Sequence, residues 1–182
     1  MDLIKTQHRL FVAITVFLFG CDLRQGKRAQ AKIEAKSQSL VSGQVVFSEK
    51  RGKVKIEISL AGVEPGPTAV HLHSVGDCSS ENATSSGGHW NPTQEKHGKW
   101  GEPPFHSGDI GNINIDENGK GVLTFIDQHS RWSIGGPSKT NVIDRAIVVH
   151  QRKDDMASQP SGAAGRRIGC GPIIEITGPT EK

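Results

Sequence analysis

The sequence predicts an all-β protein, with seven or eight short strands arranged as an antiparallel β-sandwich or flattened barrel. Apolar residues occur in short alternating runs, which is the pattern of strands with one buried face. The chain also contains 22 Gly and 9 Pro, a composition that suits an all-β domain with many turns. Its 182 residues suffice for one domain with a substantial core.

The clearest strand spans 53–63, where apolar residues from Val54 to Leu60 alternate with polar side chains. Because successive side chains of a strand point to opposite faces, the apolar set shares one buried face. The RGK segment at its start predicts a hairpin to the preceding strand, and Asn118-Gly119 predicts the turn of another. The other strands are expected at 42–49, 68–74, 112–127 (two strands), 145–151 and 170–178.

The first 20 residues are predicted to be a signal peptide outside the fold. Lys5 and Arg9 precede the apolar run LFVAITVFLFG, which is too short for an ordinary membrane-spanning helix. Its end, LFGC, resembles a bacterial lipoprotein box, so we expect lipid on Cys21; a simple signal peptide or an uncleaved anchor is the alternative. The expected division is a signal peptide at 1–20, a lipidated N-terminus and polar tether with some helix at 21–38, and the folded domain at 39–182.

Export to the periplasm or cell envelope determines how the remaining cysteines are interpreted. Cys78 and Cys170 are an even pair, which in an oxidising compartment predicts a disulfide; two buried free thiols are the alternative. The net charge is +3 without a dense basic block, so no nucleic-acid partner is expected. Contact with a membrane is expected only through the lipid anchor.

Histidines gather in an irregular segment, GGHWNPTQEKHGKWGEPPFHSGD, which ends at Asp109. Its Pro and Gly residues break any continuous helix, and an ordered loop of this length is uncommon unless something ties it down. Three of the eight histidines of the chain lie here, His89, His97 and His106. A bound metal would tie the loop, whereas surface histidines scattered by chance are the alternative.

Three more histidines are expected on strands. His71 and His73 stand two apart and point to the same face, and His150 ends another strand that can face them. A polar outer face of the sandwich is the alternative for this pair. Imidazole and carboxylate ligands suit zinc or copper, whereas magnesium and calcium prefer oxygen. With Asp109, the seven candidate ligands exceed one tetrahedral site, which favours two sites that share a ligand.

Together these motifs closely resemble the copper/zinc superoxide dismutases over about 39–177. The motifs are HLHSVGDC, GGHWNP, RAIVVH, RRIGCGPI and the spacing of His89, His97, His106 and Asp109. The resemblance implies an antiparallel Greek-key sandwich or flattened eight-stranded barrel with long metal-binding and channel loops. It also implies dismutation of superoxide to dioxygen and hydrogen peroxide by a redox-cycling copper bridged to zinc, which protects the cell envelope. A homodimer is one expected assembly.

The resemblance further implies the site residues. Copper is expected on His71, His73, His89 and His150, and zinc on His89, His97, His106 and Asp109, with His89 shared. Asp154 is expected to link His71 to His97, with the adjacent Asp155 as the alternative. Arg167 is expected beside the copper, where it acts with His89 in catalysis, and the family disulfide corresponds to Cys78 and Cys170.

The segment between His150 and Cys170 is shorter than expected for the family, so its substrate-guiding charges cannot be matched one by one. A cation near the channel would attract an anionic substrate, because charge in a narrow cleft focuses the field. The candidates for outer guides are Arg152, Lys153 and Arg166.

Two other functions compete with dismutation. A zinc hydrolase would commonly extend the HLH motif to H-x-H-x-D-H, but Val75 and Gly76 stand at the last two positions. A non-catalytic copper/zinc-binding or copper-delivery domain would tend to lose a copper ligand or the channel arginine. This chain keeps all of them, which favours the enzyme.

Overall fold

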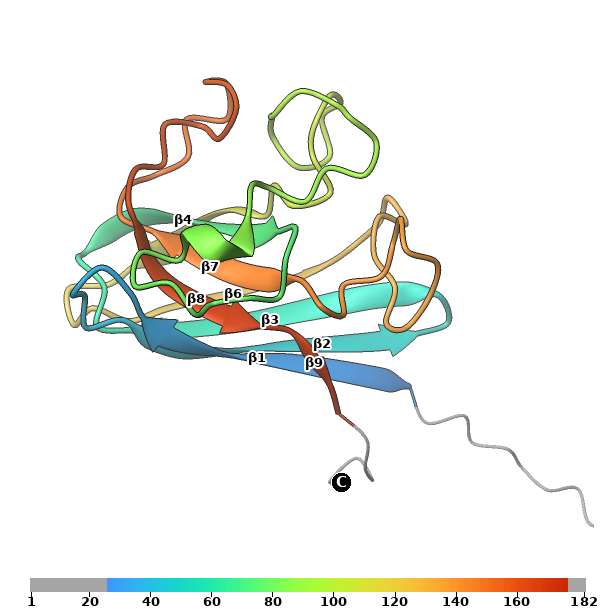
Figure 1. The fold of residues 1–182 in the computed structure, drawn as a ribbon, viewed down its shortest axis with the longest axis horizontal. Helices are drawn as coiled ribbons and strands as arrows, with labels where there is room; N and C mark the ends of the chain where they lie inside the picture. The colour runs from blue at the N-terminus through green and yellow to red at the C-terminus, as the bar shows by residue number, and fades with distance from the viewer. Residues whose placement is uncertain (1–25, 177–182) are drawn as a thin grey trace, which may run out of the picture.

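The computed structural model describes residues 26–176, which form a nearly closed antiparallel barrel (Figure 1). The strands follow the order β5-β4-β7-β8-β1-β2-β3-β6, and β9 pairs with β1. The all-β prediction is confirmed, because among these residues the helical element is the short 3-10 helix η1 at Thr84–Ser86. The strands are β1 Lys27–Ala35, β2 Ser42–Lys50, β3 Lys53–Ala61, β4 Gly66–His73, β5 Gly111–Ile115, β6 Gly121–Ile126, β7 Ala146–His150, β8 Arg167–Pro172 and β9 Ile174–Glu175.

Strand β1 shows that the predicted tether over 21–38 was wrong in most of its length. This strand pairs antiparallel with β2 from Lys27 to Ile33, and its Ala29 and Ala31 are fully buried. The sequence signal was weak because Ala is depleted in strands and contributes little apolar contrast to the alternation. The folded domain therefore includes β1 and does not begin at residue 39. The predicted signal peptide and Cys21 lie outside the described residues.

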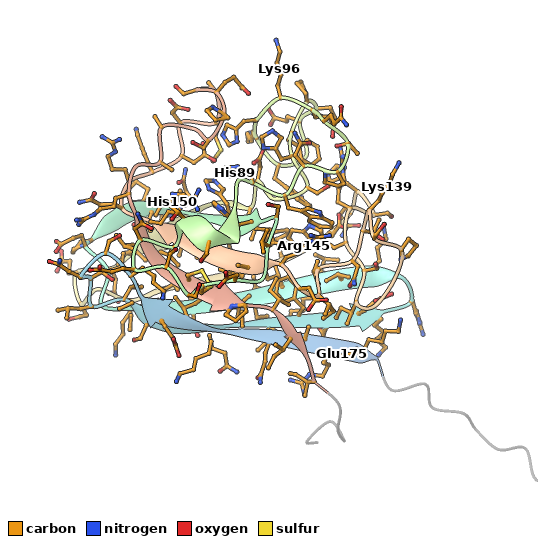
Figure 2. The ribbon with its side chains drawn as sticks, viewed as in Figure 1. His89, Lys96, Lys139, Arg145, His150 and Glu175 are labelled. Carbon is orange, nitrogen blue, oxygen red and sulfur yellow. A yellow bond between two sulfur atoms is a disulfide. The ribbon has the colours of Figure 1, made fainter. Side chains whose placement is uncertain are left out.

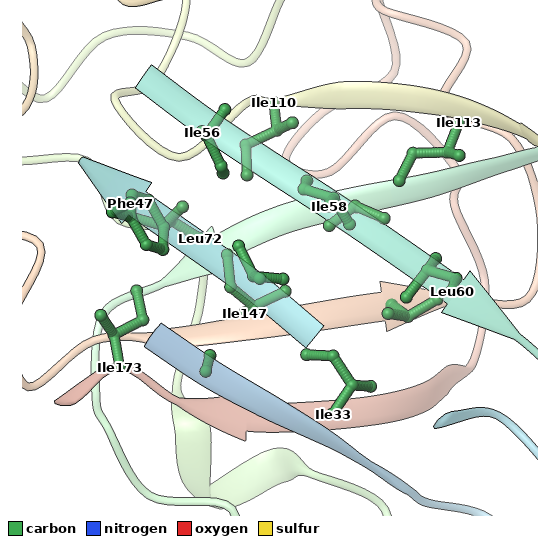
Figure 3. Packing of buried hydrophobic residues seen from close by; sticks show 14 of the residues in the cluster. Ile33, Phe47, Ile56, Ile58, Leu60, Leu72, Ile110, Ile113, Ile147 and Ile173 are labelled. Atoms are coloured by element: carbon green, nitrogen blue, oxygen red, sulfur yellow. The ribbon is translucent and has the colours of Figure 1, made fainter. Parts of the chain in front are cut away.

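The barrel interior is filled by the apolar faces of its strands, as Figure 3 shows for Phe47, Ile56, Leu72 and Ile147. The alternation predicted for 53–63 is confirmed, because every second side chain of β3 is buried. Each fully buried Ile or Leu contributes roughly 1.5–3 kcal/mol relative to an exposed one. Truncation at such a position, for example Ile56→Ala, is expected to cost about 2–5 kcal/mol.

The hairpin predicted at the start of 53–63 is present. The turn predicted at Asn118-Gly119 is present too, but the two strands that it joins do not pair with each other: β5 pairs with β4, and β6 pairs with β3. The C-terminal strand is divided. Strands β2 and β3 turn through Arg51 and Gly52, both with positive φ, and β5 and β6 turn beside Gly119. The single strand expected over 170–178 is replaced by β8, paired with β7, and β9, paired with β1. Pro172 lies at this change of partner and has no N–H to donate to a ladder.

Strands β4 and β7 carry the histidines of the predicted site. They pair antiparallel so that His71 faces Val148 and His73 faces Ala146 in the register. Strand β7 continues to His150, where a register shift against β8 marks a bulge. Bulges redirect side chains at functional sites. Two long loops, 74–110 and 151–166, rise from the same side of the barrel above these strands (Figure 1).

No helix within residues 26–176 is both long enough and apolar enough to span a membrane.

Candidate metal centre

Four histidines converge above strands β4 and β7 and form what we call the strand cluster. One ligand nitrogen from each lies within 4.8 Å of the others, for the set His71, His73, His89 and His150. Figure 2 shows His89 and His150 together beneath the loops. The loop reaches the strand through backbone pairing, because Trp90 donates to the Leu72 carbonyl at 2.8 Å. Strands β4 and β7 thus position His71, His73 and His150, and the backbone pairing at Trp90 positions the adjacent His89.

Three rings of the strand cluster are each oriented by a hydrogen bond at the outer nitrogen. His73 Nδ1 is 2.8 Å from the Gly87 carbonyl, His150 Nδ1 is 3.4 Å from the Gly165 carbonyl, and His71 Nε2 is 2.9 Å from Asp154 Oδ2. Within residues 26–176 the inner nitrogens are buried without a hydrogen-bond partner: His71 Nδ1, His73 Nε2, His89 Nε2 and His150 Nε2. Buried polar atoms are nearly always satisfied, so four converging exceptions fit a metal that receives their lone pairs.

A second group, the loop cluster, consists of His89, His97, His106 and Asp109. The Nδ1 atoms of the three histidines lie 2.8, 3.0 and 3.1 Å from Asp109 Oδ1, in chain order. The outer oxygen of Asp109 is fixed because Oδ2 accepts hydrogen bonds from the backbone N–H groups of Gly98 and His106. Three imidazole nitrogens and one carboxylate oxygen match the donor set and number of a tetrahedral zinc site.

His89 belongs to both clusters. Its Nδ1 faces Asp109 in the loop cluster, while its Nε2 is one of the unpartnered nitrogens of the strand cluster. The ring is 4.1 Å from the ring of His71 and 5.4 Å from that of His97, measured between centroids. One imidazole therefore offers a nitrogen to each of two adjacent metal positions, as the shared-ligand hypothesis requires.

The two clusters differ in their electrostatics. Burial, followed by the nearby His89 and His150, lowers the pKa of His73 well below its usual value, and burial also lowers the pKa of His89 to about 4. Such imidazoles are neutral at pH 7, which is the form that binds metals. In the loop cluster, burial of His97 is outweighed by hydrogen bonds to Asp109 and Asp154, which raise its pKa to about 9. The two carboxylates therefore favour positive charge beside His97.

Asp154 joins the two clusters. Its Oδ2 lies 2.9 Å from His71 Nε2 and its Oδ1 lies 2.9 Å from His97 Nε2. The alternative, Asp155, instead accepts hydrogen bonds from the backbone N–H groups of Ala157 and Ser158. Sequence reasoning missed Asn112 on β5, whose side-chain amide pairs with both the N–H and the C=O of Asp154. Its only sequence signal was a polar residue at a half-buried strand position.

An access pocket of about 520 Å³ opens over the strand cluster. Its lining includes His73, His150 and the half-buried Arg167, whose Nη1 donates to the Ala83 carbonyl at 2.8 Å. Among the described residues, the candidate guides Arg152, Lys153 and Arg166 do not line this pocket. Lys96 of loop 74–110 does line it. An anion that enters the pocket would therefore meet Arg167 beside two metal-facing imidazoles.

The predicted disulfide is present between Cys78 and Cys170, whose Cα atoms are 5.7 Å apart. It ties the loop that carries Ala83 and Ser86 to strand β8, which begins at Arg167. Both loop residues accept hydrogen bonds from the Arg167 guanidinium. With a sequence separation of 92, the chain-entropy model gives a stabilisation of roughly 4–5 kcal/mol. The crosslink thus supports both the fold and the position of the arginine.

Comparison with known proteins agrees with this geometry. Residues 41–173 match the family described as copper/zinc superoxide dismutase. A protein named Superoxide dismutase [Cu-Zn] from Paramecium bursaria Chlorella virus 1 is 40% identical over 140 residues, covering 73% of this chain and 72% of the viral protein. The solved structure of the clock protein EA4 superposes with a TM-score of 0.71 at 30% identity, covering 92% of this chain and 98% of that one. This chain belongs to the copper/zinc superoxide dismutase family.

Proposed function

We propose that this protein catalyses dismutation of superoxide: two superoxide anions and two protons give one dioxygen and one hydrogen peroxide. The observation that carries the proposal is the convergence of four buried, unpartnered imidazole nitrogens beside a pocket that is lined by three of their rings and by Arg167. The family assignment supports copper and zinc as the cofactors. In this proposal copper occupies the strand cluster and zinc the loop cluster, with His89 shared.

The metals and the protein divide the chemistry. Copper, when bound, supplies the one-electron redox change that dismutation needs, and zinc holds the shared imidazole. Arg167 attracts and orients the anion, because its guanidinium lines the pocket beside His150 and is charged at any physiological pH. His89 Nε2 can hold a proton and deliver it to reduced substrate, while its Nδ1 stays on the Asp109 side. Asp154 fixes the orientation of the His71 and His97 rings, because each of its oxygens contacts the Nε2 atom of one ring.

Metal analysis and kinetics on one sample test this function. Metal-reconstituted protein should contain one copper and one zinc per chain, and should consume superoxide at a rate proportional to its copper content. A single metal position would overturn the two-site assignment. Full loading of both positions without superoxide consumption would instead support the non-catalytic copper-binding or copper-delivery domain. The retained arginine and complete imidazole set favour the enzyme.

We also propose that the protein is an exported lipoprotein of the cell envelope. The support is the apolar run that ends in LFGC at Cys21. Cys21→Ser should abolish lipid attachment and release or mislocalise the protein, as fractionation and intact-mass measurement would show. If the mass and membrane association of the variant equal those of the wild type, the lipid anchor is wrong.

Dimerisation stays a prediction. The large exposed apolar side chains among residues 26–176 are scattered over several elements: Leu40, Val75, Val122, Ile126 and Ile174. Scattered apolar residues are ordinary on protein surfaces and do not define an interface. Sedimentation of the metallated protein at several concentrations would distinguish a monomer from a homodimer.

A further inference from the structure

The side chain of Gln159 makes a two-point contact with the backbone of His97. Its Oε1 accepts a hydrogen bond from the His97 N–H at 2.9 Å, and its Nε2 donates to the His97 carbonyl at 2.9 Å. The same Nε2 donates to the carbonyl of Ala157 at 3.1 Å. A primary amide has both an acceptor and two donor hydrogens, so Gln159 satisfies all three contacts at once.

These contacts hold His97 from a second direction. Asp154 fixes the Nε2 end of its ring at 2.9 Å, and Gln159 fixes its backbone. Both residues belong to loop 151–166, whereas His97 belongs to loop 74–110. With its backbone and its outer nitrogen both fixed, the ring can direct Nδ1 only toward Asp109 Oδ1, which is 3.0 Å away.

The loop that carries Gln159 packs closely against this contact and is held by internal hydrogen bonds. Gly162 has a φ of +66°, and a Cβ built there would lie 1.8 Å from Asp154 Oδ1 and 2.7 Å from His97 Nε2. The backbone therefore passes directly over the hydrogen bond between these two residues. Asp155 N–H donates to the Gly162 carbonyl at 2.9 Å, and Gly162 N–H donates to the Ser158 carbonyl at 2.6 Å. These internal bonds limit the positions that Gln159 can adopt.

We propose that Gln159 is a positioning residue for the imidazole of His97 in the loop cluster. By this contact it couples loop 151–166 to loop 74–110. Gln159 and Ser161 also line the access pocket, so the same contact holds one wall of the channel at a fixed distance from the loop cluster. The inference rests on the proposed assignment of zinc to His97. In this inference two residues of loop 151–166 hold His97 in position: Asp154 through the imidazole ring and Gln159 through the backbone.

The test compares Gln159→Met with Gln151→Met in the copper- and zinc-loaded protein. Methionine has a similar length but removes both the amide donor and the acceptor. Gln151 is an exposed glutamine of the same loop, and no side-chain hydrogen bond of Gln151 occurs within residues 26–176. Three quantities are measured: the rate of zinc transfer to a chelator, the copper content, and the visible spectrum after cobalt replaces zinc. The spectrum reports ligand geometry and requires no catalysis.

We expect zinc release from Gln159→Met to be about 10-fold faster than from the wild type, the lower end of the range for outer partners of metal ligands. The cobalt spectrum should change, copper should be retained, and Gln151→Met should behave as the wild type. Wild-type zinc release with an unchanged spectrum would overturn the inference, as would equal loss of both metals, which indicates general loosening. A wild type that binds no zinc would instead refute the underlying site assignment.

Discussion

The strand cluster and the loop cluster share His89 but are constructed differently. In the strand cluster, His71, His73 and His150 project from β4 and β7, which are paired with each other and buried within the barrel wall. In the loop cluster, every donor comes from the irregular segment 87–109. The barrel therefore fixes the backbone positions of His71, His73 and His150 before a metal arrives. The backbone of the loop cluster instead depends on hydrogen bonds within and between loops.

This contrast matches the chemistry assigned to each half. A metal that changes oxidation state benefits from rigid ligands, because reorganisation of the ligands opposes each electron transfer. A metal that keeps one oxidation state can instead order a flexible segment, as structural zinc does. The charges follow the same division, since Asp109 gives the loop cluster a carboxylate and the strand cluster has only imidazoles. The difference predicts unequal consequences when each half is damaged.

The largest expected effect is the loss of one strand-cluster ligand. His150→Ala should lower superoxide consumption by more than the roughly 10- to 100-fold typical of an outer partner, because it removes a copper ligand itself. His106→Ala should release zinc but leave copper bound and some activity present. Metal analysis and kinetics on both variants check this expectation. Equal loss of copper from the two variants would show that the clusters do not differ in rigidity.

The next effect concerns the charge in the pocket. Arg167→Glu should lower the second-order rate constant by about 10- to 100-fold, within the range for electrostatic steering, while both metals stay bound. Lys153→Glu should have a much smaller effect, since Lys153 is exposed and absent from the pocket lining. Because salt screens charges, the wild-type rate should fall as ionic strength rises. Equal losses in the two variants, or a wild-type rate that ignores salt, would refute focusing by Arg167.

A third change weakens the link between the clusters. In the wild type, the two oxygens of Asp154 face His71 Nε2 and His97 Nε2, so each ring can donate to its own oxygen. In Asp154→Asn only one oxygen remains and the amide nitrogen opposes the other ring. Zinc affinity should fall by about 10-fold or more, with a smaller decrease for copper. Chelator titration measures both, and a larger loss of copper than of zinc would contradict the proposed dependence on loops.

The strand cluster was also easier to predict from sequence than the supports of the loop cluster. The alternation around His71 and His73 indicates a strand, and a strand places both on one face without further information. The contacts of Asn112 and Gln159 join segments distant in sequence and use ordinary polar residues, so no local pattern indicates them. Strand β1 was missed for a related reason, because its buried Ala29 and Ala31 look like any alanines in a polar segment.

The outer guides proposed from the sequence stay a prediction, because a charge outside the pocket still contributes to the field at its mouth. Arg152, Lys153 and Arg166 are all exposed, yet the pocket lining excludes them. Lys96 does line the pocket, and it extends from the outer end of the metal-binding loop (Figure 2). The adjacent Glu95 also lines the pocket, but Arg131 contacts both of its carboxylate oxygens, at 2.6 and 3.1 Å.

The smallest expected effect follows from this position of Lys96. Within the described residues no carboxylate pairs with Lys96, so its charge at the pocket mouth adds to that of Arg167. Because Lys96 is exposed and solvent screens it, Lys96→Glu should lower the second-order rate by less than about 10-fold and flatten its dependence on salt. Lys99→Glu is the matched control, since Lys99 belongs to the same loop, pairs with Glu102 and does not line the pocket. If the two variants lose rate equally at low salt, net charge rather than position attracts the substrate, and the place of Lys96 at the pocket mouth has no part in guiding it.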